Sequence, residues 1–245
     1  MQLVFDFPVT PRYSFDNFVV CSGNRTAFEF ARRLTSPLAG ESVLYVYGPP
    51  GSGKSHLLNA VGRELSPGEE ELSSLSCGAI PASAASGSVE GLSPLLERLQ
   101  GAPLLLVDDI DLLPHSRLLR EGVWHLFNEC YQSGRRIVVT GAVPPRELVS
   151  VDEHLISRLL WGLVARVDVS DDDSRRLILK KLAEDRQIVL PDDVIDYLLL
   201  HTRRDVYSLI DAFGMLVRQA LASGRKISIR LARESLLPGK SVAIT

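Results

Sequence analysis

The chain lacks the features of membrane and secreted proteins. No apolar run among its 245 residues reaches the roughly 18 residues that a membrane-spanning helix needs, so we expect no membrane partner. The first residues carry neither a basic segment nor a small-residue cleavage site, which mark a secretory signal. These two absences favour a cytoplasmic location.

Cysteine is scarce, with only Cys21, Cys77 and Cys130 in the chain. Their odd number and wide separation argue against a disulfide framework, and no C-x-x-C spacing indicates a zinc site. The five histidines show no ligand spacing either. We therefore expect three reduced thiols, buried or half-buried, and no zinc.

A strong charge of one sign is also missing. The formal net charge is −3 at pH 7, so the chain lacks the basic character with which many proteins neutralise DNA phosphates. No aromatic stacking platform accompanies its arginine pairs. These pairs are expected at solvated ends of helices or strands, and the alternative is that one of them contacts single-stranded DNA or a partner. They lie at 32–33, 135–136, 175–176 and 203–204. With 45% hydrophobic residues, the composition is that of an ordinary globular chain.

Short apolar runs alternate with helical patterns before residue 170. Four runs rich in β-forming residues predict buried strands: 43–47, 104–107, 137–140 and 164–169. A helical stretch follows the glycine turn at 48–53, and another covers 114–133. Residues 66–94 are rich in Ser, Gly, Ala and Pro and indicate either a loop with a poor strand near 77–80 or a mobile segment. The alternation predicts an α/β fold, a parallel sheet with helices on both faces.

After Ser170 the strand patterns stop. Helices are predicted over 173–186, 192–201, 205–223 and 228–237, with an acidic cap at 171–173 and Gly224 ending the third helix. Trp124 and Trp161 are expected in the core or at a domain interface. The expected domains are a tail (1–9), an α/β nucleotide-binding domain (10–169) and an α-helical domain (170–245).

Residues 48–55 read GPPGSGKS and match the phosphate-binding pattern G-x-x-x-x-G-K-[ST] in full. In this pattern glycines let backbone N–H groups turn inward around phosphate oxygens, and the following helix points its positive end at the same anion. Lys54 would supply a positive charge to the β- and γ-phosphates, and the Ser55 hydroxyl would hold Mg²⁺. The sequence therefore predicts a site for ATP or ADP with Mg²⁺. The residues expected to bind it are Gly48, Gly51, Ser52, Gly53, Lys54 and Ser55.

Asp108 ends the apolar run LLLV, where a P-loop sheet places the aspartate associated with its metal. Asp109 beside it is the candidate catalytic residue that orients the attacking water, and its alternative is a solvated strand end. We expect Asp108 to join Ser55 at the Mg²⁺ ion.

With these residues placed, the chain resembles AAA+ ATPases of the DnaA group, most closely the Hda-type regulators of replication initiation. The resemblance implies a parallel P-loop sheet flanked by helices, followed by a small helical lid. It also implies an adenine pocket lined by Val19 and Val20 near His56, and an arginine finger at Arg158, which would be catalytic. The matching segments are YSFDNFVV at 13–20, SGNR at 22–25, DDI at 108–110, TG at 140–141, PPR at 144–146, LISRL at 155–159 and WGL at 161–163.

Two positions depart from the family's pattern. In the family's first sensor an acidic residue follows Thr-Gly or Thr-Ser, and this chain has Ala142 at that place. The family's second sensor is an arginine on a lid helix, and this chain has Tyr207 there. Arg203 and Arg204 lie one helical turn earlier and are candidates to replace that arginine. Because sensors read the γ-phosphate, we expect the isolated protein to hydrolyse ATP slowly.

The first residues, QLVFDFP at 2–8, resemble the short peptides with which bacterial proteins dock on the sliding clamp. Gln2 would bond at the edge of a groove while Leu3, with Phe5 or Phe7, fills it. The alternative is an edge strand or staple that packs on the protein's own body.

The resemblance implies a regulator that docks on the sliding clamp and presents Arg158 to ATP held by the DnaA initiator. Self-association into a homo-oligomer is compatible with the family. The chain ends soon after the last predicted helix, so we do not expect a helix-turn-helix module or sequence-specific duplex binding. Two alternatives stay open: a helicase loader or motor with its own DNA-stimulated ATPase, and a catalytically silent nucleotide-bound scaffold.

Overall fold

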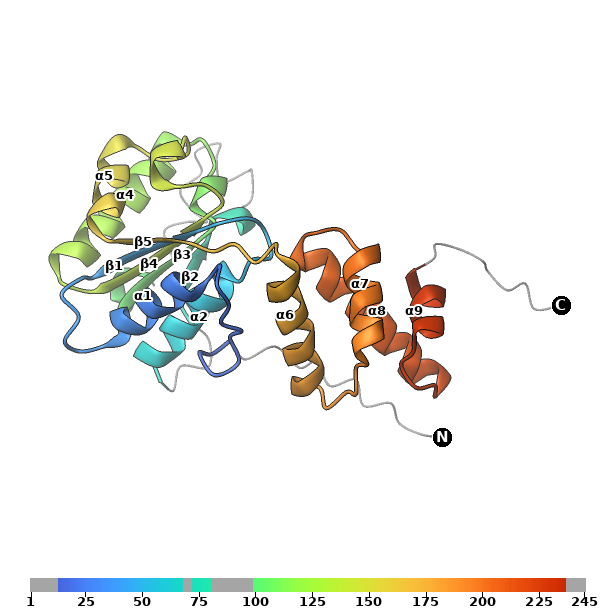
Figure 1. Cartoon of the computed structure of the whole chain (residues 1–245). Coiled ribbons are helices and arrows are strands. Elements are labelled where there is room, and N and C mark those ends of the chain that lie inside the picture. The colour runs from blue at the N-terminus through green and yellow to red at the C-terminus, as the bar shows by residue number, and fades with distance from the viewer. Residues whose placement is uncertain (1–12, 68–71, 81–98, 237–245) are drawn as a thin grey trace, which may run out of the picture.

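The structure, a computed structural model, describes residues 13–67, 72–80 and 99–236. Figure 1 shows an α/β body followed along the chain by a group of helices. The residues expected to bind the sliding clamp, Gln2, Leu3, Phe5 and Phe7, lie outside the described residues.

The described residues form one sheet of parallel strands in the order β2-β3-β4-β1-β5. Because all strands run the same way, the sheet has a carboxyl edge, where every strand ends, and an amino edge, where every strand begins. Val46 near the end of β1 lies opposite Thr140 of β4, and Leu44 near its start lies opposite Leu163 of β5. The strands are β1 (Val43–Tyr47), β2 (Ser74–Ser76), β3 (Leu104–Asp108), β4 (Arg136–Gly141) and β5 (Leu163–Arg166).

Helices cover both faces of the sheet (Figure 1). One layer contains α1 (Arg25–Thr35) and α2 (Lys54–Leu65), and the other contains α4 (Arg117–Gln132) and α5 (Glu153–Trp161). Tyr45 and Val139 pack in the α4–α5 layer, whereas Leu44 and Val138 pack in the α1–α2 layer. Side chains on a strand alternate between its faces, so a strand buried on both sides reads as a continuous apolar run. The predicted α/β fold is confirmed.

The helices after residue 170 form a lid with a core of its own, which includes Leu198, Phe213 and Leu231. As the cap pattern predicts, the Asp171 side chain accepts a hydrogen bond from the Ser174 N–H (2.8 Å), and Gly224 ends α8 with a φ of 62°. The predicted helical lid is confirmed. Its described helices are α6 (Asp172–Asp185), α7 (Asp192–His201), α8 (Val206–Ser223) and α9 (Ile229–Leu236).

A fully buried arginine fixes the start of the lid. The Arg175 guanidinium forms an ion pair with Asp172 (2.9 Å) and donates to the Thr202 hydroxyl (3.2 Å) and the Arg203 carbonyl (2.9 Å). These bonds tie the first turn of α6 to the residues that lead into α8. The expectation that Arg175 lies at a solvated helix end is wrong, because three polar partners compensate its burial.

Two strand predictions also need correction. The run 164–169 is a strand only to Arg166, because its neighbour β1 ends at Tyr47. The Val167 N–H donates a hydrogen bond (2.7 Å) to the carbonyl of Tyr47, which is the last residue of β1. Val167 and Val169 are still buried, so the remaining apolar residues line the connection to the lid. The poor strand predicted near 77–80 lies earlier, at β2, and Cys77–Ala79 form a 3₁₀ turn instead.

Other side chains also differ from expectation. Arg135 donates to the Ala102 carbonyl (3.0 Å) and Arg136 to the Glu41 carbonyl (2.9 Å), so this arginine pair ties strand β4 to neighbouring loops and is not simply solvated. Trp161, expected in a core or interface, is 66% exposed, whereas Trp124 packs against the α4–α5 layer.

The cysteines and the helices agree with expectation. All three cysteines are buried and unpaired, as the sequence predicts. None of the described helices combines the length and the apolar character that crossing a membrane requires.

Candidate nucleotide-binding site

The phosphate loop, residues 48–55, connects the end of β1 to the start of α2 at the carboxyl edge of the sheet. Gly51 has a φ of 75° and Gly53 a φ of 102°, values that favour glycine over residues with a side chain. A Cβ on Gly53 would lie 3.2 Å from the Phe18 ring, and one on Gly51 would lie 3.0 Å from the Tyr207 backbone nitrogen. The loop is therefore enclosed by the N-terminal segment and by the lid.

The polar side chains of the loop fit an anion. Lys54 is only 6% exposed, and its ammonium donates to the carbonyls of Gly48 (2.9 Å) and Pro49 (3.1 Å). The buried Ser52 hydroxyl has no hydrogen-bond partner among the described residues. Unpartnered buried polar groups are rare in proteins, and both side chains lie where the phosphate-loop pattern places a bound polyphosphate. The residues present thus suit ATP or ADP.

Thr140 joins the ends of two neighbouring strands beside the loop. Its hydroxyl donates to the Asp108 carboxylate (2.5 Å) and accepts from the Asp109 N–H (2.9 Å). Thr140 thereby fixes the orientation of the carboxylate that the sequence assigns to Mg²⁺. The described residues contain no group of three or more His, Cys, Asp or Glu side chains arranged for a metal. Mg²⁺ keeps few protein ligands when it binds with phosphates, so Ser55 and Asp108 with the nucleotide would hold it.

Asp109 has a left-handed backbone conformation and a carboxyl group with a raised pKa. Its φ of 52° lies in the left-handed region, which non-glycine residues enter at a cost and often near functional sites. Burial and the Asp108 carboxylate raise the pKa of Asp109 above its usual range, while the Lys54 ammonium opposes the rise. A general base works best when its pKa lies near the working pH. The raised pKa of Asp109 therefore suits its predicted role in orienting the attacking water.

The first sensor lacks its acidic side chain, but a carboxylate lies beside it. The Ala142 N–H donates to the Asp111 carboxylate (2.8 Å), and the Tyr45 hydroxyl donates to the Val143 carbonyl (2.7 Å). The backbone after β4 is thus held in place by side chains from β1 and from the turn after β3. The sequence did not single out Asp111 for this contact, because nothing in a local pattern relates it to residue 142.

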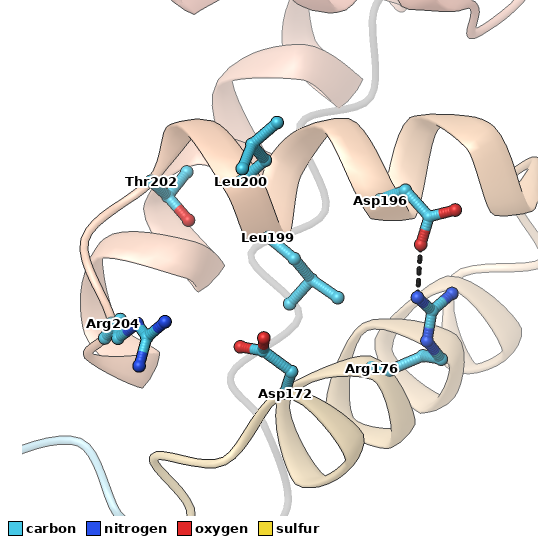
Figure 2. A pocket seen from close by; sticks show the side chains of 7 residues that line it. All are labelled: Asp172, Arg176, Asp196, Leu199, Leu200, Thr202 and Arg204. Carbon is cyan, nitrogen blue, oxygen red and sulfur yellow. Dashed lines mark hydrogen bonds and ion pairs between the residues drawn. The ribbon is translucent and has the colours of Figure 1, made fainter.

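The second-sensor position lies where α8 meets the phosphate loop. Tyr207 is 72% exposed, and its backbone nitrogen faces Gly51. Arg204 instead lines a hollow of about 360 Å³ beside α6 and α7, and the ion pair between Arg176 and Asp196 is part of its lining (Figure 2). The contacts described for Arg204 do not include the phosphate loop, and replacement of the sensor arginine by Arg203 or Arg204 stays a prediction.

The N-terminal segment packs over α2 through His56. The His56 Nε2 atom lies 2.9 Å from both the Ser14 carbonyl and the Asn17 side-chain oxygen. The Tyr13 and Phe18 rings lie 4.9 and 5.0 Å away. Burial lowers the pKa of His56, although the bond to Ser14 opposes this change, so a neutral ring is favoured. His56 thus positions the segment that the sequence assigns to the adenine pocket.

Val19 and Val20, expected at the adenine pocket, are both half-buried. The Asn24 amide donates to the Val19 carbonyl (2.8 Å), and its oxygen accepts from the Cys21 N–H (2.8 Å). Asn24 therefore fixes the backbone around both valines, and Phe18 beside them contacts the loop at Gly53. Phe18 thus brings this segment against the loop that the sequence assigns to the phosphates.

Arg158 lies away from this site. It is on the last turn of α5, and Trp161 of the same helix is followed within two residues by the start of β5. Because β5 runs parallel to β1, the start of β5 is at the amino edge, whereas the phosphate loop follows the end of β1 at the carboxyl edge. The Arg158 guanidinium lies over the rings of Tyr131 and Trp161.

A phosphate loop between a parallel strand and a helix, a carboxylate and a threonine on the two neighbouring strands, and a helical lid against the loop define a P-loop nucleotide-binding protein of the AAA+ class. Residues 9–166 match the family described as "Bacterial DnaA ATPAse domain", and residues 172–236 match "Hda, lid domain". The chain therefore belongs to the bacterial DnaA ATPase-domain family.

Curated relatives carry the same family name. The chain is 34% identical to the chromosomal replication initiator protein DnaA of Pelobacter propionicus, over 93% of this chain and 52% of that protein. It is 33% identical to the DnaA of Zymomonas mobilis, over 92% of this chain and 48% of that protein. The chain thus spans about half the length of the curated relatives it matches.

Solved structures show the same fold. Domain III of the Thermotoga maritima DnaA superposes with a TM-score of 0.80 at 27% identity, covering 95% of this chain and 100% of that one. AMPPCP-bound DnaA from Aquifex aeolicus superposes with a TM-score of 0.73 at 26% identity, covering 93% of this chain and 72% of that one. The second structure was solved with an ATP analogue in place.

Proposed function

We propose that this chain is a nucleotide-bound regulator of replication initiation. It binds ATP or ADP with Mg²⁺ at the phosphate loop and presents Arg158 to ATP held by a DnaA-type initiator, whose hydrolysis it promotes. The fit of Lys54 and Ser52 to an anion, the AMPPCP-bound relative and the match of the lid to the Hda lid domain support the proposal. A guanidinium supplied to another chain's γ-phosphate stabilises transition-state charge.

The position of Arg158 is the observation that carries this proposal. The arginine and the phosphate loop lie at opposite edges of one parallel sheet. Because β1 has five residues and each rises about 3.3 Å, the length of the sheet separates the arginine from a nucleotide on its own chain. This separation supports a role for Arg158 at a nucleotide bound to a neighbouring chain.

We also propose the domain division at residues 169 and 170. The body, 10–169, contains the two apolar layers on either side of the sheet, whereas the lid, 170–245, contains a separate cluster around Leu198 and Phe213. Val206 of α8 and Ile178 of α6 also pack against the α1–α2 layer, so the two domains share an apolar contact.

A single-turnover assay tests the proposed function. The initiator is loaded with ATP labelled at the γ-phosphate, and this chain is loaded with unlabelled ADP and added in excess with clamp-loaded DNA. Released label then comes only from the initiator. We expect the rate to rise by roughly 10² to 10³-fold, since a finger supplied in trans is worth about 10³ or more. An unchanged rate, with both proteins folded and nucleotide-bound, would contradict the proposal.

The isolated chain is expected to turn over ATP at well below 1 s⁻¹, the low end of ordinary enzyme rates. Ala142 and Tyr207 provide no charged group for the γ-phosphate, and Arg158 faces away from it. Phosphate release with Mg-ATP, with and without single-stranded DNA, measures this rate. A rate of 1 s⁻¹ or more that DNA stimulates would favour the helicase loader or motor.

The tail is expected to dock on the sliding clamp. Substitution of Gln2 and Leu3 by alanine together should weaken clamp binding at least tenfold, because anchor residues of such peptides carry most of the affinity. Val4→Ala is the matched control, since Val4 is not among the expected anchors Leu3, Phe5 and Phe7. Surface plasmon resonance on immobilised clamp compares the three proteins, and equal affinity of all three would remove the clamp from the proposal.

A further inference from the structure

Two aromatic rings hold the Arg158 side chain. Its guanidinium carbon lies 4.9 Å from the centre of the Tyr131 ring and 4.6 Å from the centre of the Trp161 ring. Both distances are within the range of attraction between a cation and an aromatic face. We propose that Tyr131 and Trp161, the ring pair, are positioning residues that keep Arg158 ready for a partner's phosphate; this inference rests on the function proposed for Arg158.

The fold fixes where the ring pair lies. Tyr131 is in the last turn of α4, just before β4 begins, and Trp161 ends α5, just before β5 begins. Both residues are therefore at the amino edge of the sheet. The Tyr131 ring also stacks on the buried Phe127 ring, with centres 6.4 Å apart and planes within 10°. One ring is thus anchored in the α4–α5 layer, and the other comes from the helix that carries Arg158.

Trp161 is exposed beyond what packing explains. A tryptophan that stabilises a core is largely buried, but Trp161 is 66% exposed and lies three residues after Arg158 on one helix. Residues three apart on a helix are neighbours on its surface. The ring therefore contacts the guanidinium more than it contributes to the core, which is the placement expected of a residue that orients Arg158.

Arg158 has no acidic partner among the described residues. Other arginines of the same layer do form ion pairs, such as Arg120 with Asp152 (3.8 Å) and Arg117 with Glu121 (2.7 Å). An ion pair would compete with a phosphate for the guanidinium donors. An aromatic face attracts the cation but leaves its in-plane N–H donors for a bidentate phosphate contact. The ring pair thus restricts the side chain without occupying its donors.

Fluorescence tests the contact in the isolated protein. The chain has two tryptophans, so Trp124→Phe leaves Trp161 as the only indole. In that background Arg158→Met should change the emission maximum and intensity of Trp161, because a cation over the indole face is replaced by a neutral chain. Arg63→Met, an exposed arginine on α2 in the opposite layer, is the matched control. Emission that responds to neither substitution overturns the proposal.

The stimulated hydrolysis of the initiator tests the consequence. Trp161→Leu or Tyr131→Leu should each lower the maximal stimulated rate roughly threefold to fivefold, as expected for loss of one cation–aromatic contact. Trp161→Phe and Tyr131→Phe, which keep a ring, should restore most of the rate. The concentration that gives half-maximal stimulation should stay the same, because positioning changes the reacting complex rather than its formation.

The outcomes separate this inference from the proposed function. If Arg158→Ala leaves stimulation intact, the arginine-finger function fails, and the ring pair has nothing to position. If Arg158→Ala removes stimulation but the leucine variants match wild type, only the ring-pair inference fails. Leucine variants that raise the half-maximal concentration without lowering the maximal rate would also overturn it, by showing that the rings contact the partner.

Discussion

Replacement of Arg158 by alanine is expected to lower the stimulated rate of initiator hydrolysis by roughly 10² to 10³-fold, close to the unstimulated rate. Arg158 is at the amino edge of the sheet, away from the phosphate loop of its own chain, so the variant should bind ADP with wild-type affinity. The single-turnover assay with labelled ATP on the initiator measures the first effect, and a calorimetric ADP titration measures the second.

Two further variants sharpen this prediction. Arg158→Lys keeps the charge but loses the planar fork that contacts a phosphate through two N–H groups, so it should restore only a small part of the stimulation. Arg63→Ala removes an exposed arginine from α2 in the opposite layer and should stimulate as wild type does. Full stimulation by Arg158→Ala would show that the initiator receives its transition-state charge elsewhere.

Replacement of Lys54 by alanine is expected to weaken ADP binding at least a hundredfold. The ammonium is buried at the loop, and charge-assisted hydrogen bonds contribute about 1.5–3 kcal/mol each. Two such bonds to phosphate oxygens would exceed the roughly 2.7 kcal/mol that a hundredfold change in affinity represents. A thermal shift measures the loss: at 100 times its Kd, ADP should stabilise the wild type by about 2.7 kcal/mol and the variant by a small fraction of that.

The comparison needs a lysine that is not in the site. Lys181 of α6 pairs with Asp185 on the same helix, and Lys181→Ala should keep the full ADP shift. The variants also separate a regulator from a silent scaffold. If Lys54→Ala lowers stability without changing ATP hydrolysis by the initiator, the phosphate loop serves folding only. That result would support the alternative of a catalytically silent nucleotide-bound scaffold.

Much of the fold and of the candidate site follows from local sequence. The strand at 43–47, the phosphate loop and the acidic end of β3 are short-range patterns, because a strand buried on both faces and a glycine turn before a helix depend on neighbouring residues. The cap at Asp171 and the stop at Gly224 are equally local. Such features involve few distant partners, so periodicity and turn residues suffice to predict them.

Features that depend on distant contacts could not be predicted. Apolar periodicity assigned neither α1 nor α5 as a helix, although the structure has both. The end of β5 is set by where β1 stops, and the burial of Arg175 depends on Thr202 and Arg203, which are far from it in sequence. The Tyr131 ring reaches Arg158 across 27 residues of chain only because the parallel sheet brings the ends of α4 and α5 to one edge.

The central claim is that the loop from Gly48 to Ser55 holds a polyphosphate, and a calorimetric titration of the wild-type protein with Mg-ADP tests it most directly. We predict one saturable site per chain, with AMP binding far more weakly because it lacks the phosphates that Lys54 and the loop contact. Folded protein that gives no binding heat with ADP at millimolar concentration would contradict the account.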